Sequence, residues 1–299
     1  MRFAPACLTL ALLAFGCRGR SPKPGPVYLP EPPATIHTFS FAVHPLHNPA
    51  RLSAAYQPLI DHLDHVVTGA HFDLETSRDY GDFEAKIRSQ APAFLLPNPW
   101  QTLKAMEVGY EVIAIAGDSE DFKGIILVRT DSGIRNLKEL RGKVVSYPSA
   151  TAVAACLLPQ SLFHAQGINV NRELINRYVG SQESTIMNVV LKLSSAGCTW
   201  PPPWRAFRKA HPDEAAQLRV LAETPHLLNN SVMVRKDVPR AIRDQAREIL
   251  IHLHESPEGR RVLEAMETHR FHPAGDEEYE PVRRYIERFE REIRPVVQP

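Results

Sequence analysis

Five short segments stand where an apolar, strand-like run gives way to a helix-like run. Their polar or aromatic members are Tyr80, Asn98, Trp100, Ser149, Thr151, Ser181, Gln182, Glu183, Thr199 and Trp200. In α/β folds ligands bind outside the carboxyl ends of strands, so these side chains are the candidate ligand-binding residues. None of them is cationic. The chemistry they suit is hydrogen bonding by neutral groups, with aromatic rings as walls of the site. The exception is Glu183, whose carboxylate could hold an amino group or a protonated oxyanion, or could equally cap the next helix.

The segment around Ser149–Thr151 is the best candidate of the five. Its sequence, VVSYPSATAVAACLLPQ (144–160), predicts a strand that turns sharply into a helix. The start of a helix presents free N–H groups and a partial positive charge, which suit an anion. Hydroxyl groups can add donors there without the cost of burying a lysine. The alternative is that Ser149 merely caps the helix.

The elements that position these residues alternate between strand-like and helix-like patterns from about Thr35 onward. Such alternation predicts parallel βαβ units. We expect an α/β protein of two lobes, each a mixed sheet flanked by helices. We predict that the chain crosses between the lobes at two extended segments, 124–129 and 231–235. Lobe I then comprises 35–128 and 231–299, and lobe II comprises 129–230. Two crossings permit hinge closure around a ligand.

The N-terminus has the pattern of an export signal. Arg2 precedes an apolar run, and Gly16-Cys17 closes it. The run 13–17 resembles a bacterial lipobox, which implies cleavage after residue 16 and lipidation of Cys17; the alternative is ordinary cleavage. Residues 17–34 are rich in proline and predict an extended tether. We therefore expect a periplasmic or cell-envelope protein anchored to a membrane through Cys17. The anchoring membrane is either the inner or the outer one.

Charge and cysteine content exclude some classes of protein. The formal net charge is +1 over 299 residues, so the chain has no overall positive charge of the kind that attracts nucleic acid.

Besides Cys7 and Cys17, the chain carries Cys156 and Cys198. In an exported protein these two either form one disulfide or remain buried thiols.

Catalytic and metal-binding motifs find little support. The sequence has no G-x-S-x-G elbow, no H-E-x-x-H and no P-loop. His44 and His47 lack a neighbouring cluster of ligating residues, so a role at the lip of a cleft is favoured over metal binding. We expect no enzyme activity, no metal and no cofactor.

Over residues 37 to 295 the chain resembles the periplasmic phosphate/phosphite/phosphonate-binding proteins of ABC transporters, a subgroup of the type II solute-binding fold. The segments that carry the resemblance are HPLHNPARL (44–52), YQPLIDHL (56–63), RDYGDFEAKI (78–87), FLLPNPWQTL (94–103), FKGIILVR (122–129), LRGKVVSYPSATA (140–152), YVGSQESTIMNVV (178–190), AGCTWPPPWRAF (196–207) and LNNSVMVRKDVP (228–239). The resemblance rests on the order and spacing of these segments along the chain, and not on any single segment.

The resemblance implies a binding protein that captures a small oxyanion between its lobes, with an ABC permease as partner. The alternative is a sensing module for a membrane histidine kinase. Tyr80 resembles the tyrosine that the family places in the cleft, and Gln182 and Glu183 stand where it often places a polar group. Ala150 and Ala152 depart from the family's Ser/Thr-rich turn. We expect a monomer.

Overall fold

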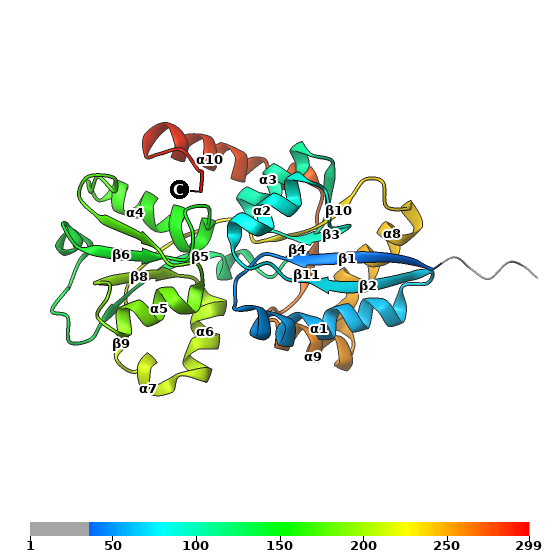
Figure 1. Ribbon diagram of the computed structural model, residues 1–299, viewed down its shortest axis with the longest axis horizontal. Coiled ribbons are helices and arrows are strands. Elements are labelled where there is room, and N and C mark those ends of the chain that lie inside the picture. The colour runs from blue at the N-terminus through cyan, green and yellow to red at the C-terminus, as the bar shows by residue number, and fades with distance from the viewer. Residues whose placement is uncertain (1–35, 299) are drawn as a thin grey trace, which may run out of the picture. The chain divides into compact units, whose positions relative to one another are not determined.

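The computed structural model describes residues 36–298 and places two mixed β-sheets in this part of the chain (Figure 1). The first sheet has six strands in the order β11-β4-β10-β3-β1-β2. They are β1 (His37–Val43), β2 (Ala70–Glu75), β3 (Phe94–Leu96), β4 (Tyr110–Ala116), β10 (Ser231–Arg235) and β11 (Phe271–Pro273). β1 pairs in parallel with β2 and β3, whereas β10 runs antiparallel to β3 and β4.

The second sheet has five strands in the order β7-β6-β8-β5-β9. They are β5 (Lys123–Arg129), β6 (Val144–Tyr147), β7 (Ile175–Tyr178), β8 (Ala196–Thr199) and β9 (Leu218–His226). β6 is parallel to β7 and β8, and β5 is antiparallel to β8 and β9. The predicted α/β class with a mixed sheet in each lobe is therefore confirmed.

Helices cover both faces of each sheet, because alternate strand residues point to opposite sides and both sets are apolar. The helices of lobe I are α1 (Pro49–Val66), α2 (Tyr80–Arg88), α3 (Pro99–Glu107), α8 (Arg240–His252) and α9 (Pro257–Ala265). Those of lobe II are α4 (Leu158–Ala165), α5 (Gln182–Val190), α6 (Pro201–Ala210) and α7 (Pro212–Ala215). In β1, Phe41 and Val43 pack with α1, α8 and α9, while Ala42 faces the core of α2 and α3.

The two connections between the sheets lie just before the segments that the sequence suggested. The chain leaves β4 at Ala116 and enters β5 at Lys123, and it leaves β9 at His226 and enters β10 at Ser231. Segments 124–129 and 231–235 are not crossings, because each is a strand hydrogen-bonded on both edges within one sheet. The connections are 117–122 and 227–230, and the sheet pairing puts residues 123–128 with lobe II.

The segment predicted as one helix from Thr151 begins instead with an irregular turn. Val153–Leu157 form a π-helix that leads into α4. Gly124 of β5 lies against this turn, and a Cβ on Gly124 would come within 2.7 Å of the Ala154 carbonyl oxygen. Glycine therefore allows the strand to support the π-helix at close range.

Both cysteines of the folded body are buried free thiols, which excludes a disulfide between Cys156 and Cys198 in this structure. The pattern of residues from Arg240 onward predicts helices alone, and the structure adds the short strand β11 there. The predicted signal (1–16) and tether (17–34), with Cys17, lie outside the described residues. Within 36–298, no helix has the length and hydropathy needed to cross a membrane.

Candidate functional site

A small cavity of about 10 Å³ lies between the two lobes. Lobe I contributes His44, Tyr80 and Asn98, and the two connections contribute Phe122 and Asn230. The residues from lobe II are Ala152, Val153, Ala154, Ala155, Gln182 and Trp200. This volume holds about one water molecule. The lobes are therefore closed on each other in this structure.

The π-helix presents its backbone donors to this cavity. The first helical hydrogen bond runs from the Cys156 N–H to the Ala152 carbonyl, at 2.8 Å. The N–H groups of Val153, Ala154 and Ala155 precede it and have no intrahelical acceptor. Ala152, at the N-cap position, provides no side-chain cap. Three backbone donors and the positive end of a helix dipole thus meet at the cavity wall, an arrangement that suits an anion.

Other helices also begin at the cavity. α2 starts at Tyr80, α5 starts at Gln182, and Asn98 and Trp200 are the N-cap residues of α3 and α6. The Asn98 side chain accepts hydrogen bonds from the N–H groups of Trp100 and Gln101, so the donors of α3 are already used. α6 opens with prolines, which have no N–H. These helices contribute dipoles, and the π-helix contributes three backbone N–H groups that have no intrahelical acceptor.

The side chains around the cavity are neutral near pH 7. Burial lowers the pKa of His44 to about 4, and its Nδ1 lies 3.0 Å from the Leu96 carbonyl oxygen. The neutral ring therefore donates from Nδ1 and keeps Nε2 as an acceptor. Burial also raises the pKa of Tyr80 well above its usual range, so the phenol remains a neutral donor. An anion here would meet dipoles and hydrogen-bond donors rather than a cationic side chain.

Four of the predicted residues line the cavity: Tyr80, Asn98, Gln182 and Trp200. The Asn98 amide donates to the Thr151 carbonyl across the two lobes at 3.2 Å. Gln182 accepts a hydrogen bond from the Thr199 hydroxyl at 2.9 Å, and its Nε2 lies 3.5 Å from the Tyr80 hydroxyl. Thr199 lies behind the cavity wall and orients the Gln182 amide.

The other predicted residues lie close to the cavity but are not part of its lining. Trp100 packs in the core that both lobes share. Ser181 caps α5 by accepting a hydrogen bond from the Ser184 N–H. Glu183 accepts from the Asn48 amide of lobe I at 3.2 Å and lies 3.4 Å from His211.

Ser149 and Thr151 are buried, and their hydroxyls contact protein groups. The Thr151 hydroxyl donates to Glu84 of α2 at 2.6 Å, and it lies 2.8 Å from the Gln298 amide nitrogen. The Ser149 hydroxyl lies 3.0 Å from that nitrogen. In this structure the hydroxyls join the lobes, while the backbone that follows them faces the cavity.

Phe122 and Asn230 were not among the residues predicted from the sequence, and His44 was expected only at the lip of the cleft. Phe122 and Asn230 immediately precede β5 and β10, which are antiparallel to their neighbours. The amino end of an antiparallel strand lies at the same sheet edge as the carboxyl ends of the strands beside it. A rule that examines only carboxyl ends cannot find them. The Asn230 Oδ1 atom is buried without a hydrogen-bond partner among residues 36–298, so this amide is available to a ligand.

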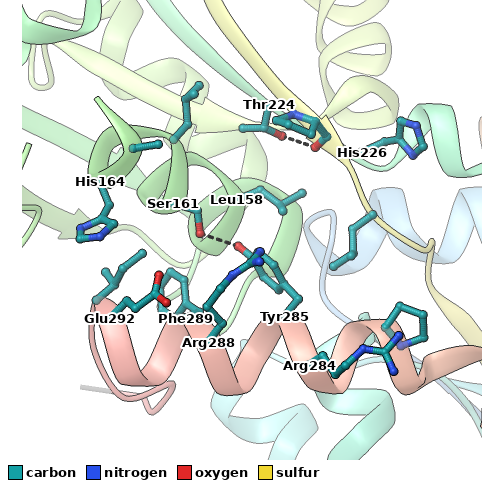
Figure 2. A pocket seen from close by; sticks show the side chains of 16 residues that line it. Leu158, Ser161, His164, Thr224, His226, Arg284, Tyr285, Arg288, Phe289 and Glu292 are labelled. Atoms are coloured by element: carbon teal, nitrogen blue, oxygen red, sulfur yellow. Dashed lines mark hydrogen bonds between the residues drawn. The ribbon is translucent and has the colours of Figure 1, made fainter. Parts of the chain in front are cut away.

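A larger hollow of about 770 Å³ lies outside the interlobe cavity, between α4, the end of β9 and α10 (Glu280–Glu292) (Figure 2). The Ser161 and Tyr285 hydroxyls are 2.8 Å apart across it and join the two helices. Its lining is mostly apolar, with arginine side chains at Arg284 and Arg288.

No group of three or more histidine, cysteine, aspartate or glutamate side chains that could hold a metal occurs within 36–298. His44 is buried and lines the cavity, whereas His47 is half-buried and is not part of the lining. Burial lowers the pKa of His47 to about 3.

Two mixed sheets, joined by two connections and enclosing a cavity, define a two-lobed α/β binding protein of the periplasmic type. Residues 41–279 match the family model described as "ABC transporter, phosphonate, periplasmic substrate-binding protein". The chain therefore belongs to the family of periplasmic substrate-binding proteins of phosphonate ABC transporters. This confirms the resemblance and the class of function predicted from the sequence. The family is one of solute-binding transport proteins.

Solved structures of low sequence identity share this fold. A binding protein component of an ABC phosphonate transporter from Pseudomonas aeruginosa superposes with a TM-score of 0.79 at 14% identity, covering 86% of this chain and 87% of that one. PhnD1 from Prochlorococcus marinus, in complex with methylphosphonate, gives 0.78 at 15% identity, covering 85% and 98%. A chloride-bound protein from Xanthomonas citri gives 0.69 at 16% identity, covering 86% and 99%. A search of curated protein sequences gives no match.

Proposed function

We propose that this protein captures a small oxyanion of the phosphonate, phosphite or phosphate type between its lobes and presents it to an ABC permease. The observation that carries the proposal is the uncapped start of the π-helix, where three backbone N–H groups precede the first helical hydrogen bond. Tetrahedral oxyanions bind readily to such helix ends. The complex of PhnD1 with methylphosphonate, which has the same fold, supports the choice of ligand class.

The donors and acceptors around the π-helix would complete the site. The Tyr80 hydroxyl and the amides of Asn98 and Gln182 can donate to an oxyanion, and Trp200 would wall the site. His44 Nε2 and Asn230 Oδ1 are acceptors, which favour a ligand that carries a hydrogen of its own, such as a singly protonated oxyanion. The Glu183 carboxylate, which accepts from the Asn48 amide of lobe I, would suit an amino group on a larger ligand.

Ligand entry requires the lobes to separate, because residues of both lobes line the cavity. The connections 117–122 and 227–230 are the hinges for that motion. Ligand would then select a form in which the lobes enclose a larger space, by a shift in the populations of open and closed states.

Isothermal titration of the folded protein with phosphate, phosphite and methylphosphonate tests the proposed function. The expected result is saturable binding of at least one of the three. Sulfate, offered at the same concentration, tests whether the site distinguishes protonated from fully ionised oxyanions. Absence of heat with all of them, at two temperatures and in protein shown to be folded, would contradict the oxyanion assignment.

We also propose that the mature chain is lipid-anchored through Cys17, with residues 17–34 as the tether, and acts as a monomer. The support is the apolar run ending in Gly16-Cys17 at the N-terminus together with the periplasmic family. Mass spectrometry of the mature N-terminal peptide should find a diacylglycerol modification on Cys17, and Cys17→Ser should release the protein from the membrane fraction. An unmodified Cys17, or an N-terminus beyond it, would contradict the anchor.

A further inference from the structure

The hollow beside α10 has the size of a small-molecule site. Its volume is about 770 Å³, and pockets that bind such ligands usually enclose about 300–1,000 Å³. It is bordered on three sides, by α4, the end of β9 and α10 (Figure 2). Among the described residues, none that lines this hollow also lines the interlobe cavity. The hollow is therefore a separate space that the proposed oxyanion function does not use.

α10 borders the hollow because it crosses from one lobe to the other. Just before α10, the Asp276 carboxylate accepts from the Val112 N–H of β4 in lobe I, at 2.8 Å. Farther along, the Tyr285 hydroxyl lies 2.8 Å from the Ser161 hydroxyl of α4 in lobe II. Buried side chains of α10 join the core that both lobes share. This helix, predicted as part of lobe I, thus lies across both lobes and leaves the hollow at its side.

The apolar part of the lining includes side chains that are only half-buried. Leu162, Leu227 and Ile293 pack against the core and keep part of their surface open to the hollow. Leu158 and Phe289 line it as well and are buried. An apolar ligand that covered this surface would remove it from water, which is favourable.

Two arginines on one face of α10 give the hollow a positive side. Arg284 and Arg288 are one helical turn apart, a spacing at which like charges repel. The Arg288 guanidinium lies 5.9 Å from the centroid of the Tyr285 ring and forms no ion pair with any residue of 36–298. Arg284 lies 3.7 Å from Glu280, which also pairs with Arg283 at 3.4 Å. An anion between the two arginines would relieve their repulsion.

The negative charge of the lining lies away from these arginines. Glu292 is the one carboxylate among the described residues of the lining, and it lies at the end of the hollow near His164 (Figure 2). It is 3.4 Å from Arg291, which is outside the lining. Two guanidinium groups against one carboxylate make the hollow complementary to an anion rather than to a cation.

We propose that this hollow is a second binding site, for an amphipathic anion that has an apolar chain and a carboxylate head. The chain covers the half-buried leucine and isoleucine side chains, and the head binds Arg288 and Arg284. A guanidinium group holds a carboxylate through two parallel hydrogen bonds, which favours this head group. The inference does not rest on the oxyanion function, because the two sites share no lining residue.

Isothermal titration with octanoate tests the second site, and 1-octanol provides a probe with the same chain and no charge. We expect saturable binding of octanoate at one site and at least tenfold weaker binding of octanol. Arg288→Gln should weaken octanoate binding about tenfold, as expected for the loss of a charge-assisted hydrogen bond. Arg291→Gln is the matched control, because Arg291 is exposed on the same helix outside the lining. It should bind octanoate like the wild type.

A variant that fills the hollow tests its location. Ala165 is exposed at the end of α4 and lines the hollow, so Ala165→Phe should abolish octanoate binding. Ala54→Phe, at an exposed position of α1, is the matched control and should not change it.

Absence of saturable octanoate binding, octanol binding as tight as that of octanoate, or equal affinities within either pair of variants would overturn the second site. The thermal unfolding of each variant shows that it is folded. If no oxyanion binds the wild type, the proposed function fails, and the octanoate titrations still decide on this site.

Discussion

Gly124→Ala should displace the π-helix of the candidate site, because Gly124 lies in β5, the strand that packs against this helix. A Cβ at this position would lie 2.7 Å from the Ala154 carbonyl oxygen and 2.8 Å from the Pro159 ring carbons. The clash involves backbone and a rigid ring, so neither neighbour can move by rotating a flexible side chain. Overpacking of this kind costs about 1–3 kcal/mol of unfolding free energy. At this size each kcal/mol lowers the Tm by about 2–4 °C.

The π-helix must shift to relieve the clash, and its N–H groups would then leave their positions at the cavity. We therefore expect Gly124→Ala to lower both the Tm and the oxyanion affinity. Gly275→Ala is the matched control, because its Cβ would meet only the Glu278 side chain at 3.6 Å, an ordinary contact. Thermal unfolding and isothermal titration measure the two effects. If Gly124→Ala has the Tm and the affinity of Gly275→Ala, the close support of the π-helix by β5 is refuted.

Three further predictions concern buried groups. Burial raises the pKa of Glu84, so the folded state binds the proton of this carboxyl more tightly than the unfolded state and loses stability as the pH rises above about 4.5. Denaturant titrations should therefore show a larger gain in unfolding free energy for Glu84→Gln over wild type at pH 8 than at pH 4.5. An equal difference at the two pH values would contradict this. Thr199→Val should cost about 1–3 kcal/mol of unfolding free energy and weaken oxyanion binding, because the Gln182 side-chain oxygen loses its buried hydrogen-bond donor. An unchanged Tm and an unchanged affinity would show that Thr199 does not orient Gln182. Burial raises the pKa of Cys156 to about 12 and that of Cys198 well above its usual range, so site-resolved mass spectrometry should find neither thiol alkylated by iodoacetamide at pH 8 until denaturant is added.

The alternation of strand and helix patterns was enough to predict an α/β protein of two lobes. The crossings could not be located in the same way. An apolar run such as GIILV in β5 indicates a buried strand, but it does not say to which sheet the strand belongs. That is decided by pairing with β8 and β9, which are distant in sequence. The short strand β11 has too few residues for a period to appear.

The candidate site was found in part because helix starts carry recognisable residues. Tyr80, Asn98, Gln182 and Trp200 stand at such starts, and the structure brings them to one cavity. The backbone donors of the π-helix have no side-chain signature, since Ala152 to Ala155 are small or apolar. The contacts of Ser149 and Thr151 with residue 298 depend on a segment almost 150 positions away, which no local pattern can indicate.

The comparison of Val153→Pro with Val153→Ala tests most directly whether backbone N–H groups hold the ligand. Val153 is the first residue of the π-helix, and Ala152 before it has extended backbone with φ −71° and ψ 106°. Proline is tolerated at such a position and removes one N–H, while alanine keeps it. We expect Val153→Pro to remain folded and to bind the oxyanion at least tenfold more weakly than Val153→Ala in isothermal titration. Equal affinity of the two variants would contradict the account of this site.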